Sequence, residues 1–350
     1  MIETPQSFAA TPDFERSSDV LGDMLRSIRL SGAVFLNSRL SAPFGLISPR
    51  HFDESTPMAH LRHVSIFHLI SAGGCTVELA SGQRETIRAG DILLMPFPDT
   101  HWFSSGEGVE MRPAMELVRA GPLSGMWSIT HGGGGEETRM VCGFIESSEL
   151  LSSPVFRTLP PMLIDRTTGD DKVGALLTTT VNEIVSLTSE ATPGSEIMLG
   201  RLMELLFVEV LRRYAARLPE SSHGWFAALN DPVLGRAMWH VHGDPGRRWT
   251  VDDLAREAGT SRTVLAARFN EVLGQAPIEY VTNWRMQLAA ERMRAGSDNL
   301  AAIASDVGYD SEAAFNRAFK RVTGVAPGRW RDGAKSARPY PKPMRKESSR

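Results

Sequence analysis

Near the C-terminus, two clusters of side chains recur with the same spacing, and both could recognise the edges of nucleic-acid bases. An Arg can donate two hydrogen bonds to guanine, an Asn can pair with adenine, a carboxylate can accept from cytosine, and methyl groups can contact thymine. The first cluster comprises Ser261, Arg262, Thr263, Ala266 and Ala267. The second comprises Ser311, Glu312, Ala313, Asn316 and Arg317. The two clusters predict a surface that reads base sequence.

Basic side chains near these clusters suit the phosphate backbone, which positions a protein on DNA without reading its sequence. The candidates are Lys320, Arg321, Arg247, Arg248 and Arg285. For any one of them alone, a solvated surface charge is an equally good interpretation. Their joint placement beside the clusters favours contact with phosphates.

The pattern around each cluster predicts a helix, a tight turn and a second helix. Gly259 and Gly308, which lie 49 residues apart, suit the left-handed residue that ends a helix. Ser261 and Ser311 then suit the N-cap of the following helix. Apolar residues four positions apart mark the buried side of that helix in each copy: Leu265 with Phe269, and Phe315 with Phe319. Two ordinary helical hairpins are the alternative, and the doubled pattern favours two helix-turn-helix motifs.

Between the two copies, residues 278–294 are predicted to form one helix. At about 1.5 Å per residue it would be about 25 Å long. A helix of this length could hold two recognition helices in successive segments of the major groove, which recur about every 34 Å. One chain would then cover two adjacent groove segments on one side of the duplex.

Residues 249–331 resemble the DNA-binding domain of AraC/XylS-type transcriptional regulators. The matching segments are 249–255, 284–289 and 307–320, followed by Gly324, Pro327 and Arg331. The resemblance implies one unit with two helix-turn-helix motifs joined by a linker helix. Ala267 departs from the family, which usually has a polar or basic residue there. The first motif is therefore expected to rely on apolar contacts and DNA shape.

The charge of the chain is unevenly distributed. From Ser221 onward there are 20 Lys and Arg against 14 Asp and Glu, a net charge of +6, whereas the whole chain carries −3. A basic C-terminal third in an acidic chain is the electrostatic pattern of a nucleic-acid-binding module. The two cysteines make no disulfide framework.

Short apolar runs separated by Gly and Pro between residues 20 and 165 predict a β-sandwich or jelly roll. Within this segment, Gly90-x5-Pro96-x-Pro98-x2-His101 resembles the second cupin motif, with Pro98 where Gly is usual. The segment is similar to the cupin-type sensor domain of one branch of AraC-type regulators. The resemblance implies a small-molecule effector bound in this domain.

His68, His101 and Cys142 are the candidate ligand-binding residues of the sensor segment. If they converge, their two imidazoles and one thiolate would suit zinc or another divalent metal. A His on the inward face of a strand is more often a hydrogen-bonded pocket residue, and the first cupin motif is incomplete. We therefore expect pocket residues and do not predict a metal centre.

Two helices are predicted between the sensor and the DNA-binding segment, at residues 172–189 and 197–217. The run 205–208 is apolar nearly all round, so the second helix must be covered on several sides. A homodimer interface that also relays the signal is favoured, and packing onto the sandwich is the alternative. His240 and His242 diverge on a helix and are interpreted as structural residues.

These patterns predict an α+β multidomain chain: a disordered N-terminus (1–19), a cupin-like sensor (20–165), a helical linker and dimerisation region (166–220), a double helix-turn-helix domain (221–333) and a basic disordered tail (334–350). No signal sequence is recognised, and no apolar run reaches the ~20 residues that a membrane helix needs. The cytoplasm is the expected compartment.

The function expected from these observations is sequence-specific regulation of transcription, controlled by a small molecule. The expected partners are double-stranded DNA, the effector, a second copy of the chain and, through promoter binding, RNA polymerase. We predict no enzyme and no catalytic residues, because no triad or Cys-His spacing stands out. A cupin enzyme would need a full metal triad, and a nonspecific architectural DNA binder would lack base-reading residues such as Asn316 and Arg317.

Overall fold

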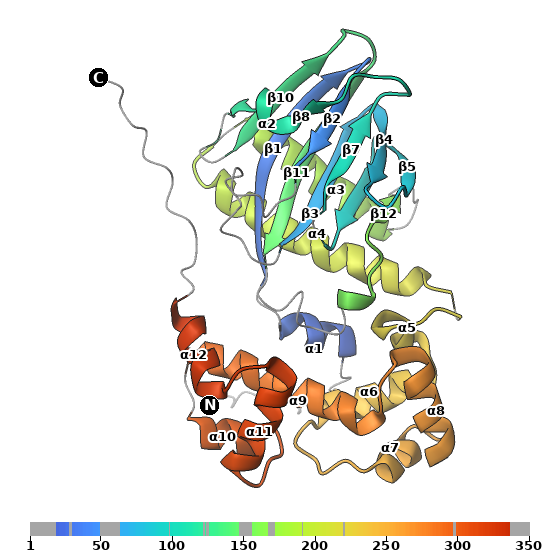
Figure 1. The fold of residues 1–350 in the computed structure, drawn as a ribbon, viewed down its shortest axis with the longest axis vertical. Coiled ribbons are helices and arrows are strands. Elements are labelled where there is room, and N and C mark those ends of the chain that lie inside the picture. The colour runs from blue at the N-terminus through green and yellow to red at the C-terminus, as the bar shows by residue number, and fades with distance from the viewer. Residues whose placement is uncertain are drawn as a thin grey trace, which may run out of the picture.

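The computed structural model describes residues 19–27, 30–49, 64–97, 99–121, 123, 126–146, 156–166, 172–190, 192–219, 221–296 and 299–336. A β-rich part lies at one end of the molecule and a helical part at the other (Figure 1). Pro98 and nearly all of the predicted disordered ends lie outside the described residues. Among the described helices, none combines the length and apolar composition needed to cross a membrane.

The strands form two sheets. The larger has the order β12-β6-β3-β11-β1-β10-β9, and the smaller β5-β4-β7-β2-β8. The larger sheet consists of β1 (Ser31–Ser41), β3 (Val64–Ala72), β6 (Asp91–Met95), β9 (Arg119–Ala120), β10 (Trp127–Gly132), β11 (Glu137–Glu146) and β12 (Leu163–Arg166). The smaller consists of β2 (Gly45–Ser48), β4 (Gly74–Leu79), β5 (Arg84–Arg88), β7 (His101–Ser104) and β8 (Arg112–Pro113).

The two sheets enclose a common apolar core, which confirms the predicted sandwich. Buried side chains in this core include Leu40, Phe44, Ile66, Val77 and Phe103. The strand β4 alternates between buried and half-buried residues, as a strand with one face inside should. Not every strand pair is antiparallel, since β1 pairs with β10 and β2 with β8 in parallel. The partners are distant in sequence, so the chain can cross over before it pairs.

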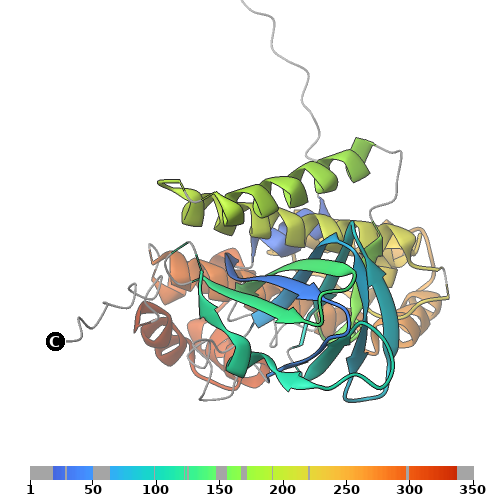
Figure 2. The same ribbon diagram turned by 90° about the horizontal axis from the view of Figure 1, so that it is seen from above.

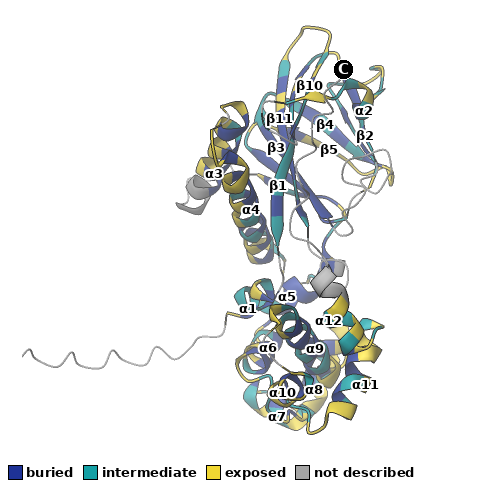
Figure 3. Cartoon of the chain, turned by 90° about the vertical axis from the view of Figure 1, so that its left-hand side faces the viewer, coloured by how far each residue is buried: buried dark blue, intermediate teal, exposed yellow. Residues whose placement is uncertain are grey.

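Helices α3 (Lys172–Ser189) and α4 (Ser195–Arg217) lie along one face of the sandwich (Figures 2 and 3), close to both predicted ranges. The α4 helix packs on β1 and β11. At Gly143 of β11, an added Cβ would lie 2.7 Å from Met203 Cε, so glycine permits this close approach. Arg213 Nε donates to Asp165 Oδ2 over 2.8 Å, and this buried pair joins α4 to β12.

The helical part follows the predicted order of two motifs around one linker helix. Its helices are α5 (Trp225–Asn230), α6 (Leu234–Gly243), α7 (Val251–Glu257), α8 (Arg262–Leu273), α9 (Pro277–Ala295), α10 (Leu300–Asp306), α11 (Glu312–Thr323) and α12 (Pro327–Ser336). The α9 helix contains the predicted linker, residues 278–294. The last helix runs three residues into the predicted disordered tail.

Three short helical elements complete the described chain: α1 (Val20–Arg26), α2 (Ala114–Leu117) and a 3-10 helix (Phe156–Thr158). The α1 helix precedes the sandwich in sequence, but it lies between the β-rich and helical parts (Figure 1) and contacts α6. It therefore occupies the junction through which the two parts meet.

Candidate DNA-binding surface and sensor cavity

The turn of each helix-turn-helix motif has the predicted local chemistry. Gly259 and Gly308 have φ of +69° and +83°, the left-handed region that glycine tolerates best. Ser261 Oγ accepts from the backbone N–H of Val264 over 3.2 Å. Ser311 Oγ accepts in the same way from Ala314 over 3.3 Å. Both predicted N-caps are confirmed, so α8 and α11 begin at equivalent places in the two motifs.

The first motif (α7 and α8) presents a mixed apolar and polar face. Ser261, Arg262, Thr263 and Ala267 are exposed, and Ala266 is half-buried. Leu265, Phe269 and Val272 form the opposite, buried side of α8. The exposed face is therefore the one that the repeated pattern predicted, with small methyl-bearing side chains at its centre.

Every arginine of the first motif has a carboxylate partner. Arg262 Nη1 lies 3.2 Å from Asp252 Oδ2, and both side chains are about two-thirds exposed (67% and 66%). Arg256 pairs with Asp253 over 2.6 Å. Arg268 pairs with the largely buried Asp231 at the C-terminal end of α5 and with Glu271. These pairs neutralise much of the positive charge that the face would offer to phosphates.

The second motif (α10 and α11) presents cations without such partners. Arg317, Lys320 and Arg321 are exposed, and within the described residues none of them pairs with a carboxylate. Ala313, Arg317 and Lys320 follow one another at i, i+4 and i+7, so they share one face of α11. This face joins one candidate base reader, Arg317, to one candidate phosphate contact, Lys320.

Asn316 lies at the edge of this face rather than at its centre. It is half-buried, and its Oδ1 is shielded from solvent without a described hydrogen-bond partner. Bidentate pairing with adenine needs both Oδ1 and Nδ2 at the base edge. Asn316 would therefore have to rotate before it could read adenine. Glu312 and Ser311 are exposed at the start of α11, as expected.

The structure gives Arg285 a role in addition to the phosphate contact that the sequence predicts. Its Nε donates to Pro245 O over 2.7 Å, and its Nη2 donates to Arg247 O over 2.7 Å. Its Nη1 reaches Gly308 O at 3.4 Å. Three of the five N–H donors of this guanidinium are thus directed at backbone carbonyls, so Arg285 braces the protein, and its contact with a phosphate stays a prediction. Arg285 joins the loop before α7 to the turn of the second motif.

The other two phosphate candidates, Arg247 and Arg248, remain at the surface. Arg247 stacks 4.1 Å above the ring of Trp249 and pairs with Glu257 over 3.1 Å. Arg248 pairs with Asp310, and both side chains are well exposed. Exposed pairs of this kind contribute little to stability and can exchange partners. Both arginines therefore lie at the surface but, like Arg262, are paired with a carboxylate.

The β-sandwich encloses a cavity of about 40 Å³ beside the candidate ligand residues. It is lined by Phe35, Leu36, Ser38, Leu46, Ser48, Pro49, His68, Phe103, Ala114, Met115, Val118, Trp127, Met140 and Cys142. The lining comes from both sheets and from α2. Two of the predicted residues, His68 and Cys142, reach the cavity directly, and His101 lies behind His68 at 3.1 Å between their Nε2 atoms.

The three predicted residues form a line of hydrogen bonds. His101 Nδ1 must donate to Asp99 O over 2.8 Å, because a carbonyl only accepts. Burial lowers the pKa of His101 to about 4, so the ring is neutral and its Nε2 accepts from His68 Nε2. His68 Nδ1 then accepts from the Cys142 thiol over 3.0 Å. Burial raises the pKa of Cys142, which keeps this thiol protonated.

This geometry brings the candidate metal ligands together without a common centre. His68 faces Cys142 with one ring nitrogen and His101 with the other, so the three donors cannot surround one ion in this arrangement. Across the described residues, no group of three His, Cys, Asp or Glu side chains is placed to hold a metal. Each donor instead satisfies its neighbour.

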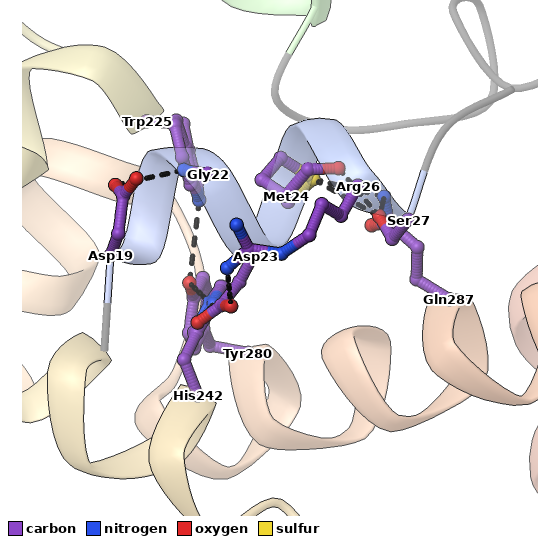
Figure 4. Close-up of polar contacts among 10 residues, drawn as sticks. All are labelled: Asp19, Gly22, Asp23, Met24, Arg26, Ser27, Trp225, His242, Tyr280 and Gln287. Carbon is purple, nitrogen blue, oxygen red and sulfur yellow. Dashed lines mark hydrogen bonds and ion pairs between the residues drawn. The ribbon is translucent and has the colours of Figure 1, made fainter. Parts of the chain in front are cut away.

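The α1 helix makes polar contacts with the helical part (Figure 4). Gln287 Nε2 of α9 donates to Ser27 Oγ over 2.7 Å and lies 2.9 Å from Met24 Sδ. His242 of α6 points its Nδ1 at Asp23, with 3.8 Å between Nδ1 and Oδ2. Val20 and Met24 are buried in the same apolar cluster as the first motif. The N-terminal helix thus joins the sensor chain to the DNA-binding segment.

A buried polar chain sets the state of His242. Tyr280 OH accepts from Trp225 Nε1 over 3.3 Å and donates to His242 Nε2 over 2.8 Å. His242 also stacks on Trp284 with ring centroids 3.9 Å apart. Burial lowers the pKa of His242 to about 3, so it stays neutral and carries its proton on Nδ1, toward Asp23. The predicted structural role of His242 agrees with this arrangement.

Sequence reasoning missed the α1 junction. Seven residues are too few for a strong helical periodicity, and Gln287 has no feature that marks a contact. One signal was present: Asp19 is a good N-cap, and its Oδ1 accepts from the N–H of Gly22 over 2.9 Å. An acidic N-cap ahead of four apolar side chains within six residues would have predicted a short helix, but not its partner.

Comparison with known proteins agrees with both halves of this description. The Cupin family model matches residues 19–216, and the Helix-turn-helix domain model matches residues 254–333. An AraC-like transcription regulator of Streptomyces lividans is 48% identical over 137 residues, 39% of this chain and 45% of that protein. The chain thus spans less than half the length of this relative.

A second relative extends over both parts of the chain. The HTH-type transcriptional regulator AlkR of Acinetobacter baylyi is 26% identical over 267 residues, 76% of this chain and 87% of AlkR. Among solved structures, ToxT from Vibrio cholerae aligns with 89% of this chain and 100% of its own, at 15% identity and a TM-score of 0.35. With a cupin match over more than half of its length and a helix-turn-helix match after it, the chain belongs to the AraC-type transcriptional regulators that carry an N-terminal cupin domain.

Proposed function

We propose that this protein binds specific DNA sites and regulates transcription from them. The observation that carries the proposal is the pair of exposed recognition helices, α8 and α11, which begin with equivalent capped turns and flank one linker helix. Nineteen residues of α9 span about 28 Å at about 1.5 Å per residue. This length suits recognition of successive major-groove segments about 34 Å apart.

The residues proposed to read bases differ between the two motifs. In the first, Arg262 and the methyl groups of Thr263, Ala266 and Ala267 face the groove. In the second, Glu312 and Arg317 read bases, with Asn316 after rotation of its side chain. Lys320, Arg321, Arg247 and Arg248 contact phosphates, and Ser261 and Ser311 begin the recognition helices. This assignment makes the second motif the more polar reader.

We further propose that a small molecule bound in the sandwich controls DNA binding. Phe35, Leu36 and Ser38 line the cavity from β1, which begins four residues after Ser27 of the α1 junction. A change in the β1 backbone on ligand binding would therefore act on α1 and its contacts with α6 and α9. The ligand would shift a population between two arrangements of the DNA-binding segment.

A homodimer is proposed through the outer face of α4. Ile197, Met198 and Leu205 are 69%, 48% and 42% exposed there, and Met198 and Leu205 lie two helical turns apart. Exposed apolar residues aligned on one helix suit a self-complementary interface. Leu205→Glu should convert the dimer to a monomer in sedimentation, whereas Ser186→Glu on the exposed face of α3 should not. Equal sedimentation of both variants would rule out α4 as the interface.

Selection of genomic DNA fragments by the purified chain at near-physiological salt, followed by sequencing, tests the main proposal. A discrete motif with elements about 10 base pairs apart is the expected result. The selection is repeated with candidate effectors, which the products of genes beside the recovered sites suggest. The proposal of specific binding would be overturned if DNA were recovered without sequence preference, and only at low salt, both with and without these effectors. Transcription with purified RNA polymerase from a recovered site then tests the proposed polymerase contact, and cell fractionation tests the proposed cytoplasmic location.

A further inference from the structure

The cavity of the sandwich is apolar and uncharged. Among the described residues that line it, none is Asp, Glu, Lys or Arg. Burial of an unpaired carboxylate or ammonium group in such surroundings costs several kcal/mol. The described part of the lining therefore disfavours charged molecules.

Most of the polar groups around the cavity are already engaged. Ser38 Oγ donates to Met140 O over 3.0 Å. His68 and Cys142 are committed to the line of hydrogen bonds that ends at Asp99. Ser48 Oγ and Trp127 Nε1 have no hydrogen-bond partner among the described residues. The lining thus offers an occupant one hydroxyl group, one indole N–H and otherwise apolar contact.

The walls and the size of the cavity limit the shape of its occupant. Phe35, Phe103 and Trp127 contribute aromatic surface, and Met115 and Val118 contribute flexible or branched aliphatic surface. The cavity has a volume of about 40 Å³. The space suits a compact group rather than a long chain.

We propose that the cavity binds a compact, uncharged, mainly apolar molecule of about one aromatic ring, with at most one neutral hydrogen-bonding group directed at Ser48. This ligand would be the effector of the proposed sensor function, on which its biological role rests. Its binding to the cavity can be measured without DNA. The same chemistry predicts that carboxylates bind the described lining more weakly than neutral molecules do.

Titration calorimetry on the full chain with phenol, toluene and benzoate tests the proposal. Phenol and toluene should bind with a negative heat-capacity change, and benzoate should bind at least about tenfold more weakly than phenol. Ala114→Leu, which fills the cavity, should abolish binding of both neutral probes while a cooperative thermal transition is retained. Benzoate binding as tightly as phenol, or neutral-probe binding unchanged in Ala114→Leu, would overturn the proposal.

A second variant tests the contribution of the Ser48 hydroxyl group to binding. Ser48→Ala should weaken phenol about fivefold, the effect of losing one neutral hydrogen bond, and should leave toluene unchanged. Ser65→Ala is the matched control, because Ser65 is buried and donates to Pro96 O away from the cavity. Equal losses for phenol and toluene in Ser48→Ala would contradict the assigned role of Ser48. Phenol binding that leaves DNA affinity unchanged would overturn the sensor function but uphold the ligand class.

Discussion

The two helix-turn-helix motifs share one sequence pattern, but they are attached to the rest of the molecule in different ways. The core of the first motif, including Leu265 and Phe269, is continuous with α1, α3, α4 and the outer face of the larger sheet. The core of the second, around Phe315 and Phe319, is a separate cluster. The α9 helix divides between them, with Tyr280 to Trp284 in the first cluster and Met286 to Met293 in the second.

The difference in packing parallels the difference in charge. The arginines of the first motif are paired with carboxylates, whereas Arg317, Lys320 and Arg321 of the second lack such partners among the described residues. Phosphate binding depends on available cations, and mechanical coupling depends on shared core. We infer that the second motif anchors the protein on DNA, while the first links DNA reading to the state of the sensor.

The largest expected effect comes from truncating the equivalent core residue in each motif, which should show that only the first motif is coupled to the sensor. Phe269→Ala and Phe319→Ala each remove a fully buried ring, at a cost of about 3–5 kcal/mol. In hydrogen-exchange mass spectrometry, Phe269→Ala should loosen α1, α6 and the sensor helices as well as α8. Phe319→Ala should loosen only residues 286–336. Loss of protection in α3 and α4 to the same extent in both variants would contradict the division of the core.

Acid should act on the first motif and the sensor, and spare the second motif. His242 and His101 have folded pKa values of about 3 and about 4, below the ordinary 6.5. Between these values and 6.5 the unfolded chain binds more protons, so stability is lost as the pH falls below about 6.5. At pH 5 each residue accounts for about 2 kcal/mol. Residues 286–336 contain no histidine and lack this contribution.

Thermal melts and hydrogen exchange between pH 7.5 and 5 measure this effect. His242→Phe, which retains an aromatic ring against Trp284, should remove about half of the acid-induced loss of stability that the two histidines cause together. His240→Phe is the matched control on the same helix, since His240 is only half-buried. An unchanged pH dependence in His242→Phe would show that burial of His242 is not the cause.

On DNA, the second motif should show the larger effect of a single substitution. Arg317→Ala should cost about 1–3 kcal/mol and relax preference at one base pair, whereas Lys320→Ala should weaken all sites and lower the salt slope by about 1. Arg262→Ala in the first motif should cost less, because Arg262 already has a carboxylate partner. Binding titrations at several salt concentrations separate these outcomes. Identical, sequence-blind losses from Arg317→Ala and Lys320→Ala would remove Arg317 from the base readers.

Local chemistry explains which features could be predicted from the sequence. Caps, left-handed glycines and four-residue apolar spacing act within a few residues, so the motifs, the linker helix and the helices α3 and α4 follow from pattern alone. Strand composition likewise predicts the sandwich. The parallel pairs β1–β10 and β2–β8 do not follow, because pairing of distant strands depends on the path of the whole chain.

The site residues divide along the same line. His68, His101 and Cys142 were identified as neighbours, but only the fold shows that their atoms line up instead of converging. Arg285 carries the side chain expected of a phosphate contact. Only the fold shows that it hydrogen-bonds three backbone carbonyls from two segments that are distant in sequence. The contact of Gln287 with α1 spans 260 residues, which no local pattern encodes.

The smallest expected effect concerns the carboxylate partners of the arginines in the two motifs. Asp252→Asn removes the partner of Arg262 and should alter stability by no more than about 0.2–1 kcal/mol, since the pair is exposed. It should nevertheless tighten DNA binding and steepen its salt dependence, because Arg262 becomes available to a phosphate or a guanine. Asp310→Asn is the parallel test beside the second motif, where it releases Arg248. If carboxylate pairing lowers the DNA affinity of the first motif, Asp252→Asn will raise DNA affinity more than Asp310→Asn. Equal gains in affinity would mean that the place of each motif on the duplex, and not carboxylate pairing, determines its contribution to binding.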